Sequence, residues 1–173
     1  MLEIIKNYKK NKKFRNIDRG TNVFIDYSVD IYTPEMLTIE NNVSIQFGCK
    51  LFATGGGITI GEGTILAHDV QILSRNHYYD GEDLKYIPYD ERFINKRVVI
   101  GKYCWIGARV TILPGTEIGD GVVIGAGAVV SGRIDSYAVC AGNPAKVIKY
   151  RDKDIFLKLF NEGKGYIANT KHY

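Results

Sequence analysis

An aliphatic residue recurs every six positions through the C-terminal half of this chain, and no other feature limits its fold as strongly. From Ile100 the sequence divides into IGKYCW, IGARVT, ILPGTE, IGDGVV, IGAGAV and VSGRID, where the first place is always Ile or Val. The second place is usually Gly and the fifth is usually small. The same spacing occurs at Ile60, Leu66 and Ile72, and more loosely in the units that begin at Ile25, Ile39 and Ile45.

A period of six matches neither the 3.6-residue period of an α-helix nor the simple alternation of a long strand. It suits a short strand followed by a tight turn, in which the aliphatic side chain points inward and Gly permits the turn. Three such units in each coil would stack Ile100 on Ile118 and Ile106 on Ile124. The pattern therefore predicts an all-β parallel solenoid with a filled core, whose functional groups lie on the outside.

The repeats resemble those of the hexapeptide-repeat acyltransferases over residues 20–150. This resemblance implies a left-handed parallel β-helix, a homotrimer with active sites between subunits, and acetyl-CoA as the acyl donor. Carbonic-anhydrase-like proteins use the same solenoid, so the repeat is more specific for the fold than for the function.

Three parts are expected along the chain: a basic N-terminal segment (1–19), the β-helix domain (20–150) with an inserted loop (74–98), and a C-terminal helix and tail (151–173). TPEML (33–37) and GGG (55–57) are expected to be small corner insertions. In RDKDIFLKLFNEG the apolar residues fall on one face of a short helix that ends near Gly163. We expect this helix to lie over the end of the solenoid and to cap its exposed strand edge.

The net charge of +4 is concentrated at the N-terminus, where residues 1–20 hold seven Lys and Arg against two acidic residues. A basic segment of this kind is most simply solvated, and its alternative partners are nucleic acid, anionic lipid or a phosphate-bearing substrate. Nothing else in the chain favours nucleic acid.

No run of 18 apolar residues occurs, so we expect at most peripheral membrane contact. The N-terminus lacks the apolar core of a signal peptide, which favours a cytoplasmic location.

Two of the three cysteines, Cys49 and Cys104, occupy the small fifth place of a repeat unit. They are expected to be interior residues and not a disulfide or a metal site. A metal site of the carbonic-anhydrase type needs three converging histidines. Since only His68 and His77 are suitably placed, we expect no metal.

The repeat breaks at SRNHYYDG (74–81), because the 28-residue step from Ile72 to Ile100 is not a multiple of six. A long excursion from a regular solenoid is more often functional than accidental. His77 lies at the break. His68 is expected at an outward turn position, and His172 lies in the terminal tail.

NHYYDG is similar to the NHxxDG of the xenobiotic acetyltransferases, and the Trp-Ile-Gly of YCWIGARVTILPG matches the segment after the catalytic loop in the maltose and galactoside acetyltransferases. The resemblance implies that His77 is the general base of a direct transfer in a ternary complex. Imidazole suits this role at neutral pH. Asp80 or a backbone carbonyl is expected to orient it. Asn76, Tyr78 and Tyr79 are expected to contact a sugar acceptor, since tyrosine rings stack on sugars.

The segment AGNPAKVIKYR (141–151) resembles the segment with which these enzymes close over coenzyme A. The resemblance implies phosphate contacts from Lys146 and Lys149, with Arg151 as a further cation. The other residues that it implies for the acyl donor are Trp105, Ala108, Ala126 and Ser131. The galactoside branch has Thr-Lys where this chain has Ser131 and Gly132, and Arg133 is the alternative cation there.

The compact size, the GNPAKVIK ending and the loop together most resemble the bacterial surface-polysaccharide O-acetyltransferases. This resemblance implies an acetyl-CoA-dependent O-acetyltransferase that acts on a sugar hydroxyl of a bacterial glycan or glycan precursor. The alternatives are a xenobiotic O-acetyltransferase, a sugar-nucleotide N-acetyltransferase and, as a different class, a non-enzymatic trimeric scaffold.

Overall fold

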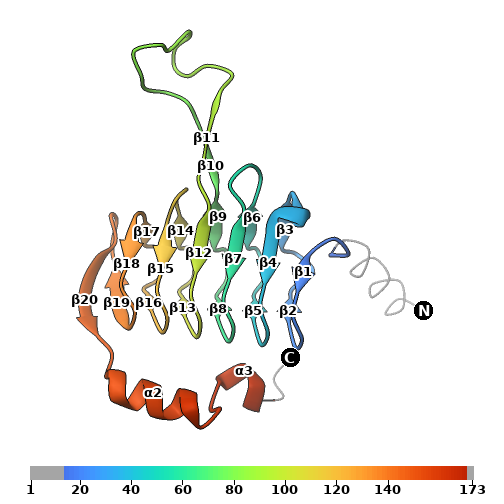
Figure 1. The fold of residues 1–173 in the computed structure, drawn as a ribbon, viewed down its shortest axis with the longest axis vertical. Coiled ribbons are helices and arrows are strands. Elements are labelled where there is room, and N and C mark those ends of the chain that lie inside the picture. The colour runs from blue at the N-terminus through green and yellow to red at the C-terminus, as the bar shows by residue number, and fades with distance from the viewer. Residues whose placement is uncertain (1–13, 171–173) are drawn as a thin grey trace.

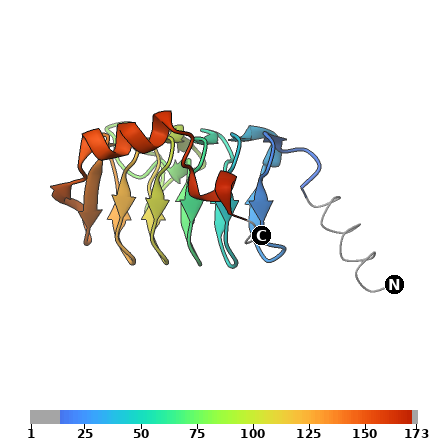
Figure 2. The same cartoon turned by 90° about the horizontal axis from the view of Figure 1, so that it is seen from below.

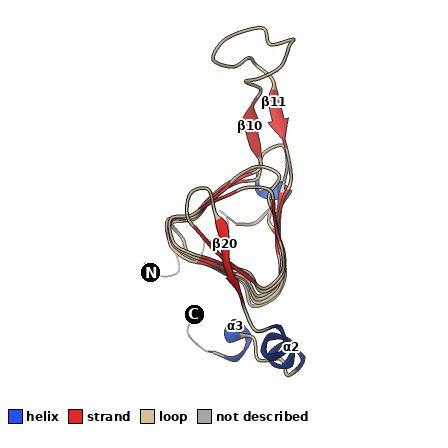
Figure 3. Ribbon diagram, turned by 90° about the vertical axis from the view of Figure 1, so that its left-hand side faces the viewer, coloured by secondary structure: helices blue, strands red, loops and turns tan. Residues whose placement is uncertain are grey.

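The computed structural model describes residues 14–170 of the 173-residue chain. It is a parallel β-solenoid of about six turns whose three sheets form a triangular prism (Figures 1 and 3). Most of the expected basic segment lies outside the described residues. Within them, the first strand begins at Asp18, slightly before the expected start of the solenoid, and Phe14 and Ile17 are buried in its core.

The chain visits three sheets in the order A, B, C in every turn. Sheet A contains β1 (Asp18–Arg19), β4 (Leu37–Ile39), β7 (Ile58–Ile60), β12 (Val98–Ile100), β15 (Glu117–Ile118) and β18 (Arg133–Ile134). Sheet B contains β2 (Phe24–Ile25), β5 (Ser44–Ile45), β8 (Ile65–Leu66), β13 (Trp105–Ile106), β16 (Val123–Ile124), β19 (Ala138–Ala141) and β20 (Lys146–Tyr150). Sheet C contains β3 (Asp30–Tyr32), β6 (Lys50–Phe52), β9 (Gln71–Leu73), β14 (Thr111–Ile112) and β17 (Val129–Val130).

The register of the parallel strands confirms the predicted stacking. Ile100 pairs with Ile118 in sheet A, and Ile106 pairs with Ile124 in sheet B. These side chains form buried columns along the axis, and Cys49 and Cys104 are buried among them as predicted. Each fully buried aliphatic side chain contributes about 1.5–3 kcal/mol through removal of its surface from water. The inside is filled, so the cavities lie on the outer surface.

The extended loop leaves from the corner between sheets C and A, here called the C–A corner. It begins and ends as an antiparallel hairpin of β10 (Arg75–His77) and β11 (Phe93–Asn95), which projects from the solenoid (Figures 1 and 3). The two predicted insertions lie at the same corner, one as the 3₁₀ helix η1 (Pro34–Met36) and the other as a turn at residues 53–57.

The C-terminal helix α2 (Lys153–Asn161) is present, but its predicted position over the solenoid end is wrong. It lies along the corner between sheets A and B, the A–B corner, and is followed by α3 (Tyr166–Asn169) (Figure 2). Phe156 packs against Tyr137, and Phe160 packs against Tyr103. The last strand edge is paired instead by β20, which runs antiparallel to β19. Residues 151–170, which follow β20, are here called the C-terminal clasp. Since β20 already covers the strand edge, the clasp packs along the A–B corner.

The clasp reaches the first coil, where Asn22 Nδ2 donates to the carbonyl oxygen of Ile167 at 3.4 Å. Neither helix of the clasp, nor any other helix among residues 14–170, has the length and apolar character needed to span a lipid bilayer.

Candidate active site

The imidazole of His77 is held between aromatic rings at the base of the hairpin. Its ring centroid lies 3.8 Å from that of Tyr89, with 23° between the planes, and 4.9 Å from that of Phe93, with 39° between the planes. Phe93 faces His77 because the two residues are register partners across β10 and β11. The Nδ1 atom is buried and has no hydrogen-bond partner among residues 14–170. Since Nε2 is not among the buried atoms without a partner, we infer that this is the ring nitrogen that a substrate would meet.

Asp80 makes no hydrogen bond with His77 within the described part of the chain, and its side chain is exposed. The orienting contact that we expected from this carboxylate is thus not formed. Asn76 is also exposed, and its Oδ1 accepts the backbone N–H of His77 at 2.9 Å. A buried Nδ1 without a partner is unfavourable, because a desolvated polar atom loses its hydrogen bonds to water.

Tyr78 is engaged within the loop. Its hydroxyl donates to Asp83 Oδ1 at 2.8 Å, and the Arg92 guanidinium lies 4.1 Å from its ring centroid. The bond to Asp83 raises the pKa of the Tyr78 phenol, and Arg92 lowers the pKa of the Asp83 carboxyl. Tyr79, by contrast, is exposed. Of the two tyrosines predicted to contact the acceptor, Tyr79 is therefore the one whose ring is exposed to solvent.

Ala108 and Ala126 lie at the corner between sheets B and C, the B–C corner, on successive turns. They line a surface cavity of about 490 Å³ together with Phe47, His68, Asp69, Arg109 and Gly127. The Phe47 and His68 rings stack with centroids 4.1 Å apart, and Arg109 Nε lies 3.9 Å from Asp69 Oδ2. A groove with small side chains at one end and stacked rings at the other therefore runs along this corner.

The other residues predicted to hold the acyl donor are more widely spread. Trp105 begins β13 on the outer face of sheet B and is exposed, whereas Ser131 lies at the C–A corner of the last turn. Lys146 and Lys149 are exposed on β20. Arg133, the alternative cation, lies 3.7 Å from Asp135 at an exposed position of sheet A.

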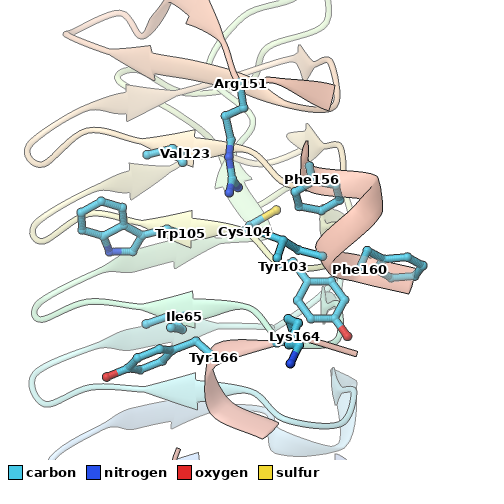
Figure 4. Close-up of a pocket in the computed structure, with 13 residues that line it drawn as sticks. Ile65, Tyr103, Cys104, Trp105, Val123, Arg151, Phe156, Phe160, Lys164 and Tyr166 are labelled. Atoms are coloured by element: carbon cyan, nitrogen blue, oxygen red, sulfur yellow. The ribbon is translucent and has the colours of Figure 1, made fainter. Parts of the chain in front are cut away.

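Trp105 also lines a second cavity, of about 320 Å³, between sheet B and the C-terminal clasp (Figure 4). Arg151 is directed into it: one guanidinium nitrogen donates to the Gly121 carbonyl at 2.9 Å, and the group lies 5.1 Å from the Phe156 ring centroid. Arg151 thus connects the clasp to the A–B corner, and the phosphate contact that the resemblance implied for it stays a prediction.

A single chain does not bring the predicted site residues together. His77 and Ser131 belong to the C–A corner, whereas Ala108 and Ala126 belong to the B–C corner. These corners are separated by the width of sheet C, as the view along the axis shows (Figure 3). One chain therefore brings the members of each group together, but not the two groups with each other.

Sequence reasoning missed Phe93 and Phe47, which pack on His77 and His68, and it took Tyr89 as one of the tyrosines of the loop without placing its ring against His77. The signal for Phe93 was its position opposite His77, which follows once the two ends of the loop are paired as strands. The signal for Phe47 was its place in the repeat, since IQFGCK puts it at the same turn position that His68 occupies in LAHDVQ. Among residues 14–170 no three His, Cys, Asp or Glu side chains gather in a way that would hold a metal ion.

Comparison with known proteins identifies the class of this solenoid. The family model described as "Bacterial transferase hexapeptide (six repeats)" matches residues 97–132. The chain is 35% identical over 147 residues to the Escherichia coli K12 protein WbbJ, which bears the name of a lipopolysaccharide biosynthesis O-acetyl transferase; the match covers 82% of this chain and 74% of that one. The chain therefore belongs to the hexapeptide-repeat acetyltransferases.

Two further comparisons concern individual members of this family. The chain is 46% identical over 125 residues to a chloramphenicol acetyltransferase of Agrobacterium fabrum, a match that covers 68% of this chain and 60% of that one. A galactoside acetyltransferase solved in complex with coenzyme A superimposes with a TM-score of 0.71 at 27% identity, covering 90% of this chain and 70% of that chain. These similarities support an acetyltransferase.

Proposed function

We propose that this protein transfers an acetyl group from acetyl-CoA to a sugar hydroxyl of a bacterial glycan or glycan precursor, with His77 as the general base. One observation carries the proposal: the histidine at the break of the repeat is fixed between two aromatic rings, with Nδ1 buried and Nε2 available. The similarity to WbbJ and to a galactoside acetyltransferase supports a sugar acceptor.

In the proposed reaction the acceptor hydroxyl attacks the thioester carbonyl while Nε2 of His77 removes the hydroxyl proton. The new C–O bond gives a tetrahedral oxyanion, which collapses with cleavage of the C–S bond. The departing thiolate takes the proton from the imidazolium, which restores neutral His77. General-base assistance of this kind contributes about 10²–10⁴-fold to a rate.

We propose that the site forms between copies of a homotrimer. A second copy would place its B–C corner, with Ala108 and Ala126, beside the hairpin that carries His77. Ser131 lies on the His77 side of this junction. On the acyl donor, Trp105 would flank the pantetheine arm, and Lys146 and Lys149 would pair with its phosphates.

The acceptor in this proposal meets Asn76 and Tyr79, with Tyr78 contributing its ring edge. Asp80 is exposed and makes no hydrogen bond with His77 among the described residues. We therefore propose that its carboxylate faces the acceptor and does not orient the imidazole. Asp80→Asn is expected to reduce turnover less than loss of His77 does.

The test is acetyl-CoA-dependent thiol release with a panel of nucleotide sugars, glycan oligosaccharides, amino sugars and antibiotics, with products identified by mass. His77→Ala and His77→Asn should retain acetyl-CoA binding and the native fold while turnover falls by about 10²–10⁴-fold. Full activity of His77→Ala would exclude it as the base. A folded protein that does not bind acetyl-CoA would support the scaffold alternative.

A second candidate acceptor is an antibiotic hydroxyl. The 46% identity to a chloramphenicol acetyltransferase and the NHYYDG motif favour it. Turnover of an antibiotic in the same panel, without turnover of any sugar, would establish this alternative.

A further inference from the structure

The outer part of the hairpin, residues 78–92, is organised around one ion pair. Arg92 Nε donates to both carboxylate oxygens of Asp90 at 3.0 Å, and its Nη2 lies 2.6 Å from Asp90 Oδ2. The Asp90 side chain is fully buried, although it lies in a loop that projects from the solenoid. A fork-shaped guanidinium that binds a carboxylate through several bonds sets direction as well as distance.

The same arginine ties a second stretch of the loop to this pair. Its Nη1 lies 2.6 Å from Asp83 Oδ2, and its Nη2 donates to the Asp83 carbonyl at 2.9 Å. Asp90 in turn accepts the backbone N–H groups of Lys85 and of Arg92 itself, at 3.3 and 2.9 Å. The bonds from Arg92 hold the pKa of the Asp90 carboxyl well below its usual range, so this group is charged at neutral pH.

Backbone bonds connect the ion pair to His77. The N–H of Tyr78, the residue after His77, donates to the Arg92 carbonyl at 3.0 Å, and the N–H of Asp90 donates to the Tyr78 carbonyl at 3.2 Å. The two rings that pack on His77 directly flank the pair, since Tyr89 precedes Asp90 and Phe93 follows Arg92. Tyr89 belongs to no strand, so its position depends on its neighbours.

We propose that Asp90 and Arg92 are positioning residues, which fix Tyr89 and Phe93 against the imidazole and thereby aim Nε2 of His77 at the acceptor hydroxyl. This inference rests on the proposed function, because it assigns a purpose to the pair through His77. An imidazole on an exposed hairpin has several rotamers, and a displacement of about 1 Å at a reacting atom costs about 100-fold in rate.

Two substitutions test the pair with little change in shape. Asp90→Asn removes the charge, and Arg92→Lys keeps a charge but removes the fork. Glu91→Gln is the matched control, since Glu91 lies between them and forms an exposed pair with Lys85, with 3.6 Å between Lys85 Nζ and Glu91 Oε1. The C–H resonances of His77, observed with isotope-labelled histidine and assigned with His77→Ala, report on the stacked rings, because aromatic ring currents shift them.

We expect Asp90→Asn and Arg92→Lys to move the His77 resonances towards those of a free imidazole and to lower kcat by about 10–100-fold, with acetyl-CoA affinity unchanged and the solenoid still folded. Glu91→Gln should change none of these. Tyr89→Leu, which removes a ring and leaves the pair, should reproduce both effects.

Unaltered His77 resonances in both variants would overturn the proposal, as would altered resonances with undiminished kcat. The resonance measurement is independent of catalysis. Full activity of His77→Ala would therefore refute the proposed function, while the resonances would still decide whether Asp90 and Arg92 hold the rings.

Discussion

Single residues in this fold have sharply different environments according to their place in the six-residue unit. The first and fifth places point inward, so Ile106 and Cys104 are almost completely buried, while Trp105 between them is 56% exposed. Side chains at the outward places are the ones that a substrate can reach. The third place at the B–C corner changes from Phe47 and His68 in the early turns to Ala108 and Ala126 in the later ones.

The buried thiols are expected to be inert in the native protein. Burial raises the pKa of Cys104 to about 12 and that of Cys49 to about 11, and it also raises the pKa of Cys140. Since the thiolate is the reactive form, its population at pH 8 is very small. A chromogenic thiol reagent at pH 8 should label no cysteine before the protein unfolds and all three afterwards. Rapid labelling of the native protein would contradict this expectation.

At the scale of elements, the solenoid carries two appendages that differ in how they are held. The hairpin depends on ring stacking and on ion pairs in its loop, whereas the C-terminal clasp depends on aromatic packing along the A–B corner. The clasp also requires small residues beneath it. Gly121 has φ of 67°, and a Cβ added there would lie 2.7 Å from the Phe156 ring.

Gly121→Ala is therefore expected to loosen the clasp. Left-handed backbone costs a residue other than glycine about 1–2 kcal/mol, and displacement of Phe156 adds to this cost. Gly132→Ala is the matched control, because Gly132 has a similar φ of 72° with open space where the Cβ would lie. Thermal unfolding should show a larger loss of stability for Gly121→Ala. Equal losses would mean that backbone strain alone is responsible and that the clasp contact is unimportant.

At the scale of the whole molecule, the proposed site depends on which corner of the prism carries each of the predicted residues. His77, the predicted base, lies at the C–A corner, whereas Ala108 and Ala126, predicted for the acyl donor, lie at the B–C corner, so the proposed site joins two copies. In a closed homo-oligomer every junction has the same composition, and each copy contributes one side of two sites.

This arrangement predicts complementation between two inactive variants. His77→Ala removes the base, and Ala126→Trp fills the exposed acyl-donor corner, so each alone should be inactive. In a trimer that contains both variants, formed by co-expression with different tags, one of the three sites (about a third) should combine an intact hairpin with an intact corner. Thiol release in the doubly purified oligomer should recover to about that fraction. No recovery in a folded mixed oligomer would place both residues in one chain's site.

How much the sequence predicts can be judged from particular residues. The spacing of six residues between Ile100, Ile106, Ile112 and Ile118 by itself determined the solenoid and its register. The reason is that one inward side chain every six residues fits a filled triangular coil. The break at residues 74–81 likewise marked His77, since a regular repeat makes any interruption visible.

Other features were decided only by the tertiary structure, because they depend on contacts between residues distant in sequence. The antiparallel pairing that brings Phe93 to His77 lies outside the repeat, so no periodic pattern in the sequence predicts it. The clasp lies along the A–B corner because β20 already pairs the last strand edge and Tyr103 and Tyr137 offer aromatic surfaces there. The sequence by itself thus determined the periodic scaffold, where each unit repeats the same local energetics. The tertiary structure decided where the aperiodic segments pack, because their free energy depends on the particular surfaces that the scaffold presents.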